Sequence, residues 1–173
     1  MFGLVVSSTI QTHTTQENSI MARKTLIERA IAQIEENAAV YSGDVKPFLD
    51  PQVSSDYVKL KLSKEKNEVF MVMYLNNQHE LIKTVKEFRG TIDGCSVHPR
   101  VIVQRALELN AAAVIFAHNH PSGVLDPSQS DIRITDRLKT ALNLVEVRVL
   151  DHLILGRENG RYVTASFAER GML

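Results

Sequence analysis

Two histidines and an aspartate are spaced so that they can share one metal ion. His118 and His120 follow a short apolar run at 112–117, and Asp131 comes near the start of an expected helix. In a strand, residues two apart point to the same face, so both imidazoles can converge on one point. Two imidazoles and a carboxylate are usual ligands of a catalytic zinc ion, which keeps a fourth position for water. Zinc lowers the pKa of that water from about 16 to about 7, so the pattern indicates hydrolytic chemistry.

The chain must turn sharply between these residues. The segment from Pro121 to Pro127 contains glycine, proline and aspartate and is predicted to be a loop, which returns the following helix to the strand end. A structural explanation also exists, because Ser128 and Asp131 match a capping box at the start of that helix. A His-x-His pair is moreover common by chance. Spacing alone therefore leaves metal binding and helix capping open.

Strand-length apolar runs alternate with segments of helical period after residue 50. The pattern predicts strands over 68–75, 80–88, 112–117, 146–155 and 161–163, and helices over 51–62, 98–109 and 128–142. Such alternation around one sheet is typical of an α/β domain with strands of mixed direction.

The chain of 173 residues fits one domain with a short appendage. Residues 1–21 are rich in Ser, Thr and Gln and are predicted to be a flexible tail. Residues 22–49 are expected to form a helical arm and a linker, with an amphipathic helix from about 22 to 37. The main domain is predicted over 50–173. The apolar stripe of the arm must cover the main domain or a partner chain, so a homodimer is one expectation.

Composition excludes several classes of protein. Lys and Arg number 20 and Asp and Glu number 20, and this balance argues against a basic nucleic-acid-binding surface. A single cysteine, Cys95, excludes an internal disulfide, a multi-cysteine zinc cage and an iron–sulfur cluster.

No apolar run is long enough to span a membrane, and the first residues do not resemble a secretory leader. A cytoplasmic protein is expected.

These motifs resemble those of a known family. His118-Asn-His120-Pro121, then a gap of six residues, then Ser128-x-x-Asp131 resembles the JAMM motif of the MPN-domain metalloproteases. The runs HNHPSG at 118–123, SVHPR at 96–100 and LDHLI at 150–154 are similar to the bacterial RadC family in particular. The resemblance covers the chain from about residue 50 onward. It implies the MPN/JAMM fold, a cytidine-deaminase-like mixed sheet flanked by helices, preceded here by the N-terminal helical arm.

The resemblance also implies roles for individual residues. His118, His120 and Asp131 match the three zinc ligands, Glu68 matches the general base, and Ser128 matches the serine that stabilises the oxyanion. It implies zinc-dependent hydrolysis of an amide or isopeptide bond in a protein or peptide substrate. Without the resemblance, Glu68 would be interpreted as an ordinary carboxylate at the start of a strand.

Other interpretations remain. A DNA-repair-associated accessory protein would use the zinc domain for binding instead of catalysis. The chain departs from the longer RadC pattern, because no helix-hairpin-helix motif is evident in it. Its neutral net charge also disfavours direct DNA binding. A zinc deaminase is excluded, since it needs Glu in place of His120 and a cysteine pair. A structural zinc site would need a further ligand, such as Cys95 or His152.

Asp151 and His152 are themselves expected to form a buried pair, with a hydrogen bond from His152 to the metal site as the alternative.

Overall fold

The computed structural model describes residues 48, 50–90 and 97–173. The tail predicted over 1–21, the arm and linker predicted over 22–49 (apart from Phe48) and Cys95 lie outside the described residues. The homodimer expected from the arm therefore stays a prediction. Within the described part of the chain, no helix has the length and apolar character needed to cross a membrane.

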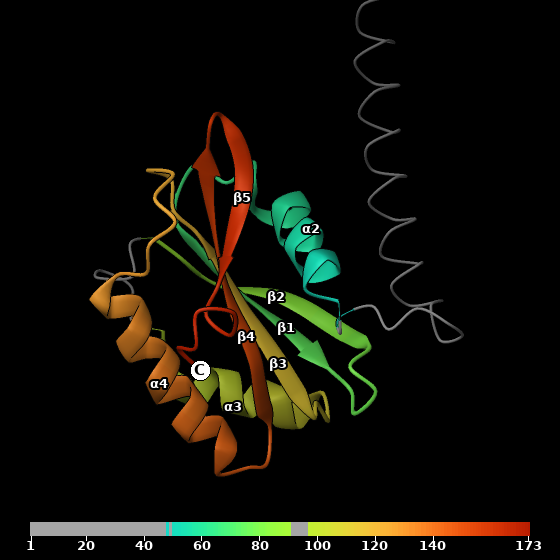
Figure 1. Ribbon diagram of the computed structural model, residues 1–173. Helices are drawn as coiled ribbons and strands as arrows, with labels where there is room; N and C mark the ends of the chain where they lie inside the picture. Colours follow the sequence, from blue (N-terminus) through green and yellow to red (C-terminus); the bar gives the residue numbers. More distant parts are fainter. Residues whose placement is uncertain (1–47, 49, 91–96) are drawn as a thin grey trace, which may run out of the picture. The chain divides into compact units, whose positions relative to one another are not determined.

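Five strands form one mixed sheet in the order β2-β1-β3-β4-β5 (Figure 1). The central pair β3 and β4 is parallel, whereas the other neighbouring strands are antiparallel. The strands are β1 (Val69–Leu75), β2 (Leu81–Arg89), β3 (Ala113–Asn119), β4 (Arg148–Glu158) and β5 (Arg161–Ser166). The predicted fold class, a mixed α/β sheet flanked by helices, is confirmed.

Helices cover both faces of the sheet. Helix α2 (Pro51–Leu62) lies on one face, and α3 (Pro99–Glu108) and α4 (Gln129–Asn143) lie on the other (Figure 1). Alternate residues of β1 therefore enter two different cores. Val69, Met71 and Met73 pack in the core beneath α2. Phe70, Val72 and Tyr74 pack in the core beneath α3 and α4. Because both faces are covered, every residue of β1 and β3 is buried.

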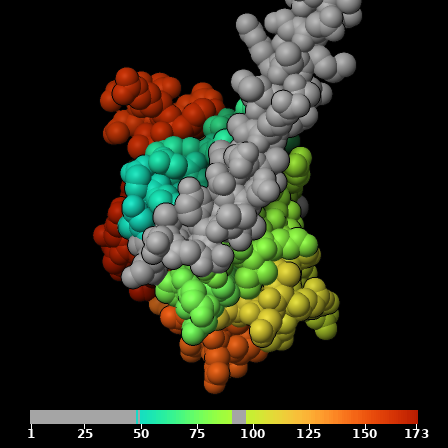
Figure 2. All heavy atoms as spheres, turned by 90° about the vertical axis from the view of Figure 1, so that its right-hand side faces the viewer, coloured from blue at the N-terminus to red at the C-terminus, as the bar shows by residue number. Residues whose placement is uncertain are grey.

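Helix α2 is fixed at its start and along its length. The carboxylate of Asp50 accepts a hydrogen bond of 2.8 Å from the backbone N–H of Gln52, and Pro51 occupies the first helical position. Hydroxyl pairs tie the helix to β5 and β2, through Ser55 with Thr164 and Tyr57 with Thr84. In the space-filling view, α2 (cyan) accordingly lies between the β4–β5 hairpin (red, top) and the β1–β2 hairpin (green) (Figure 2).

Strand β4 extends further than predicted at its end. It begins at Arg148 and runs through Gly156 to Glu158, whereas the predicted strand covers 146–155. The glycine is required by a close approach, since a Cβ atom there would lie 2.6 Å from the carbonyl oxygen of Gly123. The loop 121–127 thereby rests directly on β4, where the backbone N–H of Arg157 donates to Gly123 O at 2.8 Å. This contact holds the loop that joins the two predicted ligand segments.

Candidate metal centre

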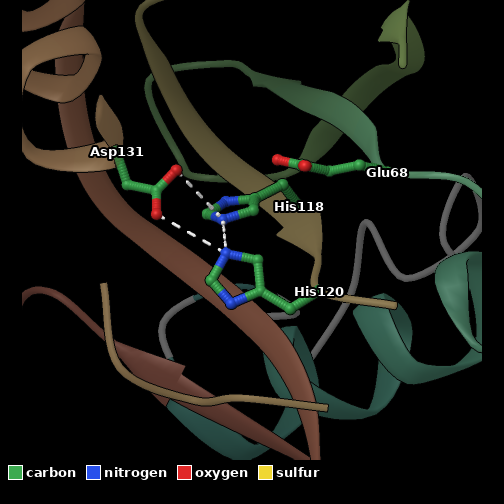
Figure 3. Close-up of side chains that lie close together, drawn as sticks. All are labelled: Glu68, His118, His120 and Asp131. Carbon is green, nitrogen blue, oxygen red and sulfur yellow. Dashed lines mark hydrogen bonds and ion pairs between the residues drawn. The ribbon is translucent and has the colours of Figure 1, made fainter. Parts of the chain in front are cut away.

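Four side chains from three parts of the fold converge at one end of β3. His118 lies in β3 and His120 just beyond it, Asp131 lies in the first turn of α4, and Glu68 immediately precedes β1. Antiparallel pairing of β1 with β3 sets Phe70 opposite His118, which brings Glu68 to the histidines. One ligand atom from each of the four residues lies within 4.8 Å of the other three (Figure 3).

A backbone contact fixes the orientation of His120. Its Nδ1 lies 2.8 Å from the carbonyl oxygen of Val124. A carbonyl oxygen only accepts, so the ring donates through Nδ1–H, and in the neutral ring Nε2 carries the lone pair. That Nε2 lies 2.9 Å from Nε2 of His118 and 3.5 Å from Oδ2 of Asp131. The loop resting on Gly156 therefore aims a ligand-type nitrogen into the cluster.

The two oxygens of Asp131 have different roles. Oδ2 accepts from the backbone N–H of Ser128 at 2.7 Å, and the Ser128 hydroxyl accepts from the N–H of Asp131 at 3.1 Å, which is a complete capping box. Oδ1 is buried, lies 3.3 Å from Nε2 of His118 and accepts no hydrogen bond from any described residue. Capping and ligation, which compete as explanations of the sequence, are thus compatible in the structure.

Burial and charge set the protonation of the cluster. Burial by itself would raise the pKa of Asp131, but the contacts with His118, His120 and Ser128 outweigh it and hold that pKa well below its usual range. Complete burial lowers the pKa of His118, whereas the bond to Asp131 raises the pKa of His120 against the opposing effect of burial. The carboxylate is therefore ionised, and of the two imidazoles His120 holds an additional proton more readily.

This arrangement fits a zinc ion. Two imidazole nitrogens and an ionised carboxylate oxygen meet at short distance, and a proton or a cation must lie among them to offset their mutual repulsion. Nitrogen and oxygen donors of this kind are the ligands of three-residue zinc sites. Oδ1 of Asp131, which is buried and accepts no hydrogen bond from a described residue, is the atom that such an ion would satisfy. Glu68, which is only partly buried, adds a second carboxylate at the rim.

Asn119, which lies between the two histidines, holds the backbone on both sides of Glu68. Its side-chain oxygen accepts from the N–H of Val69 at 2.9 Å, and its amide donates to the carbonyl of Asn67 at 3.0 Å. The side chain is buried and the bond to Val69 is shielded from water, whereas the bond to Asn67 is only partly buried. The HNHPSG run contains this residue, but nothing in the sequence pattern indicates its role.

The Asn119→Ala variant is expected to lower the free energy of unfolding of the metal-free protein by about 2–4 kcal/mol, because it removes one buried and one partly buried hydrogen bond and leaves the buried N–H of Val69 unsatisfied. Urea unfolding of the full chain measures this loss. Asn143→Ala, at an exposed position near the end of α4, is the control and should change stability by less than about 0.5 kcal/mol. Equal stability of both variants would contradict the structural role of Asn119.

His152 lies behind the cluster and is not paired with the side chain of Asp151 as expected. Its Nε2 is 2.8 Å from Nδ1 of His118, and its Nδ1 is 2.7 Å from the hydroxyl of Thr135. Asp151 instead accepts from Ser166 at 2.6 Å. Successive residues of β4 point to opposite faces of the sheet, which separates the two side chains. With both ring nitrogens engaged, His152 is not a further ligand, and the alternative expectation of a hydrogen bond to the site is correct.

A pocket of about 270 Å³ opens beside His120. It is bounded by the end of α2 and the segment that follows it, by the end of β3 and the start of the loop after it, and by the β4–β5 hairpin near its turn. Cationic side chains contribute to its lining, namely Lys64, Lys66 and Arg157. The pocket offers space for a ligand next to the four-residue cluster.

Fold and site together define a domain of the JAB/MPN type. A family model described as "RadC-like JAB domain" matches residues 48–172, so the chain belongs to this family. It is 52% identical over 126 residues to a UPF0758 protein of Vibrio cholerae, covering 73% of this chain and 77% of the relative. It is 49% identical over 146 residues to one of Leptothrix cholodnii, covering 84% of this chain and 64% of that relative. With one of Aeromonas hydrophila it shares 54% identity over 127 residues, covering 73% of this chain and 55% of the relative. The chain thus spans about half to three quarters of these relatives.

Proposed function

We propose that this domain is a zinc-dependent metallopeptidase that hydrolyses an amide or isopeptide bond in a protein or peptide substrate. The observation that carries the proposal is the convergence of His118, His120 and Asp131, with a buried Oδ1 of the aspartate among them that accepts no hydrogen bond from the described residues. These three residues would hold the ion. Glu68 stands at the rim of the same cluster, with a carboxylate oxygen within 4.8 Å of the three ligand atoms (Figure 3).

A zinc ion held there would supply a Lewis acid for a substrate carbonyl and would make water acidic enough to lose a proton near neutral pH. Glu68 would take a proton from the attacking water and would return it to the leaving amine. The reaction needs no covalent bond between enzyme and substrate. Asn119 supports the role of Glu68 by fixing the backbone on both sides of it.

Ser128 is suited to stabilise the negative charge that develops on the substrate oxygen. In the capping box its oxygen is an acceptor, so its O–H is still a donor. The residue is exposed and lies at the N-terminus of α4, where the partial positive charge of the helix also favours an anion. Capping would hold the hydroxyl in place for this second task.

The test is a proteome-wide search for new N-termini and freed lysine side chains in cells that express the wild-type chain or the Glu68→Gln variant. New ends or freed lysines that depend on Glu68 are expected. Their absence, together with salt-sensitive binding of DNA by the purified protein, would favour the DNA-repair-associated accessory role instead.

A further inference from the structure

A chain of three hydrogen bonds runs behind the cluster, from α4 through β4 to β3. Thr135, one turn after Asp131 on α4, donates its hydroxyl to the carbonyl of Asp131 at 2.6 Å. The same hydroxyl oxygen lies 2.7 Å from Nδ1 of His152, and Nε2 of His152 lies 2.8 Å from Nδ1 of His118. All of these side chains are buried, so the bonds are shielded from water.

The donor and acceptor of each of these three hydrogen bonds follow from the first bond, between Thr135 and the carbonyl of Asp131. A carbonyl oxygen cannot donate, so the hydrogen of Thr135 points to Asp131, and its oxygen must accept from Nδ1–H of His152. The His152 ring is fully buried among Phe70, Phe116 and Phe167, where a neutral ring is strongly favoured. Its Nε2 is then an acceptor, and it accepts from Nδ1–H of His118.

We propose that Thr135 and His152 are positioning residues that hold His118 in the tautomer with its proton on Nδ1 and its Nε2 lone pair turned toward Asp131 and His120. The inference rests on the proposed metal site, because a lone pair at Nε2 is what a metal ion requires of His118. The chain begins at the backbone of one predicted ligand and ends at the ring of another. It therefore couples the position of α4 to the ring orientation at the end of β3.

Packing alone does not explain a histidine at position 152. The ring stacks on Phe167 with centroids 4.7 Å apart and makes edge contacts with Phe70 and Phe116 at 5.5 and 5.8 Å. A phenylalanine could make the same contacts without burying two polar nitrogens. The His152→Phe variant thus keeps the aromatic packing and removes the hydrogen bonds, whereas His152→Gln provides an acceptor and a donor.

Paired variants of the full chain test the proposal through zinc affinity, measured by competition with a chelator. Thr135→Val and His152→Phe are expected to weaken zinc binding about 10- to 100-fold, whereas Thr135→Ser and His152→Gln remain within about threefold of wild type. Unchanged affinity in both Thr135→Val and His152→Phe would overturn the proposal. So would an equal loss in all four variants, because a purely structural role would not be rescued by the conservative changes.

Nitrogen-15 NMR of the metal-free wild-type chain tests the tautomer without any variant or any bound ion. We expect the proton of His118 on Nδ1 and that of His152 on Nδ1, and a proton on Nε2 of His118 with none on Nδ1 would overturn the inference. If the tautomers are as expected but the wild type binds no zinc, the metal site fails and the hydrogen-bond chain stands. If zinc binds but the tautomers differ, the metal site stands and the proposed role of Thr135 and His152 fails.

Discussion

Asp131→Asn is expected to weaken zinc binding about 100- to 1,000-fold. Binding free energies of roughly 10–16 kcal/mol for four-ligand zinc sites correspond to about 2.5–4 kcal/mol per ligand, and each 1.4 kcal/mol is a factor of ten. The amide of asparagine can still accept from the N–H of Ser128, so the capping box and the helix should persist. What disappears is the negative charge beside His118 and His120. Competition with a chelator measures the loss.

The matched control is Asp136→Asn, which removes an exposed carboxylate from the same helix. It should bind zinc with wild-type affinity and unfold at the same temperature within a few degrees. Two results would each contradict the assignment of Asp131 as a ligand, namely wild-type zinc affinity in Asp131→Asn or an equal loss of affinity in the control.

Glu68→Gln is expected to reduce hydrolysis about 10²- to 10⁴-fold while the zinc content stays near that of the wild type. Glutamine has the size of glutamate but cannot take a proton from water, so proton transfer is lost and the ligands remain. The rate can be measured on any peptide or isopeptide found by the proteome-wide search. Zinc content is measured by elemental mass spectrometry on the same preparation.

Glu146→Gln is the control for this variant, because Glu146 lies in an exposed turn at the far end of α4. It should retain both full activity and zinc. If Glu68→Gln lost its zinc, Glu68 would be a ligand and not the base. If it kept both zinc and activity, another group would have to move the proton.

The sequence predicted the layout of the fold and the convergence of His118, His120 and Asp131 from short-range patterns, whereas the family resemblance alone added Glu68 to the site. The continuous apolar runs of β1 and β3, the proline and glycine of the loop at 121–127 and the capping box at Ser128 are all patterns of a few neighbouring residues. The spacing indicated the ligand roles and the family resemblance favoured them, whereas the base and oxyanion roles come from the resemblance alone. All of these roles remain predictions.

Contacts between distant segments were beyond these patterns. The bonds from Asn119 to the backbone beside Glu68 depend on the antiparallel pairing of β1 with β3, which no local pattern encodes. The role of His152 depends on the parallel register that sets it opposite Phe116, and on α4 bringing Thr135 over β4. The continuation of β4 through Gly156 likewise reflects the loop that packs on it and not the preference of glycine for turns.

A crystal structure of the full chain grown with zinc would locate the ion itself. We expect one ion held by Nε2 of His118, Nε2 of His120 and a carboxylate oxygen of Asp131, with nitrogen distances of about 2.0–2.1 Å and a water molecule in the remaining position. An ion bound elsewhere, or a fourth position filled by a protein group such as the thiolate of Cys95, would contradict this expectation.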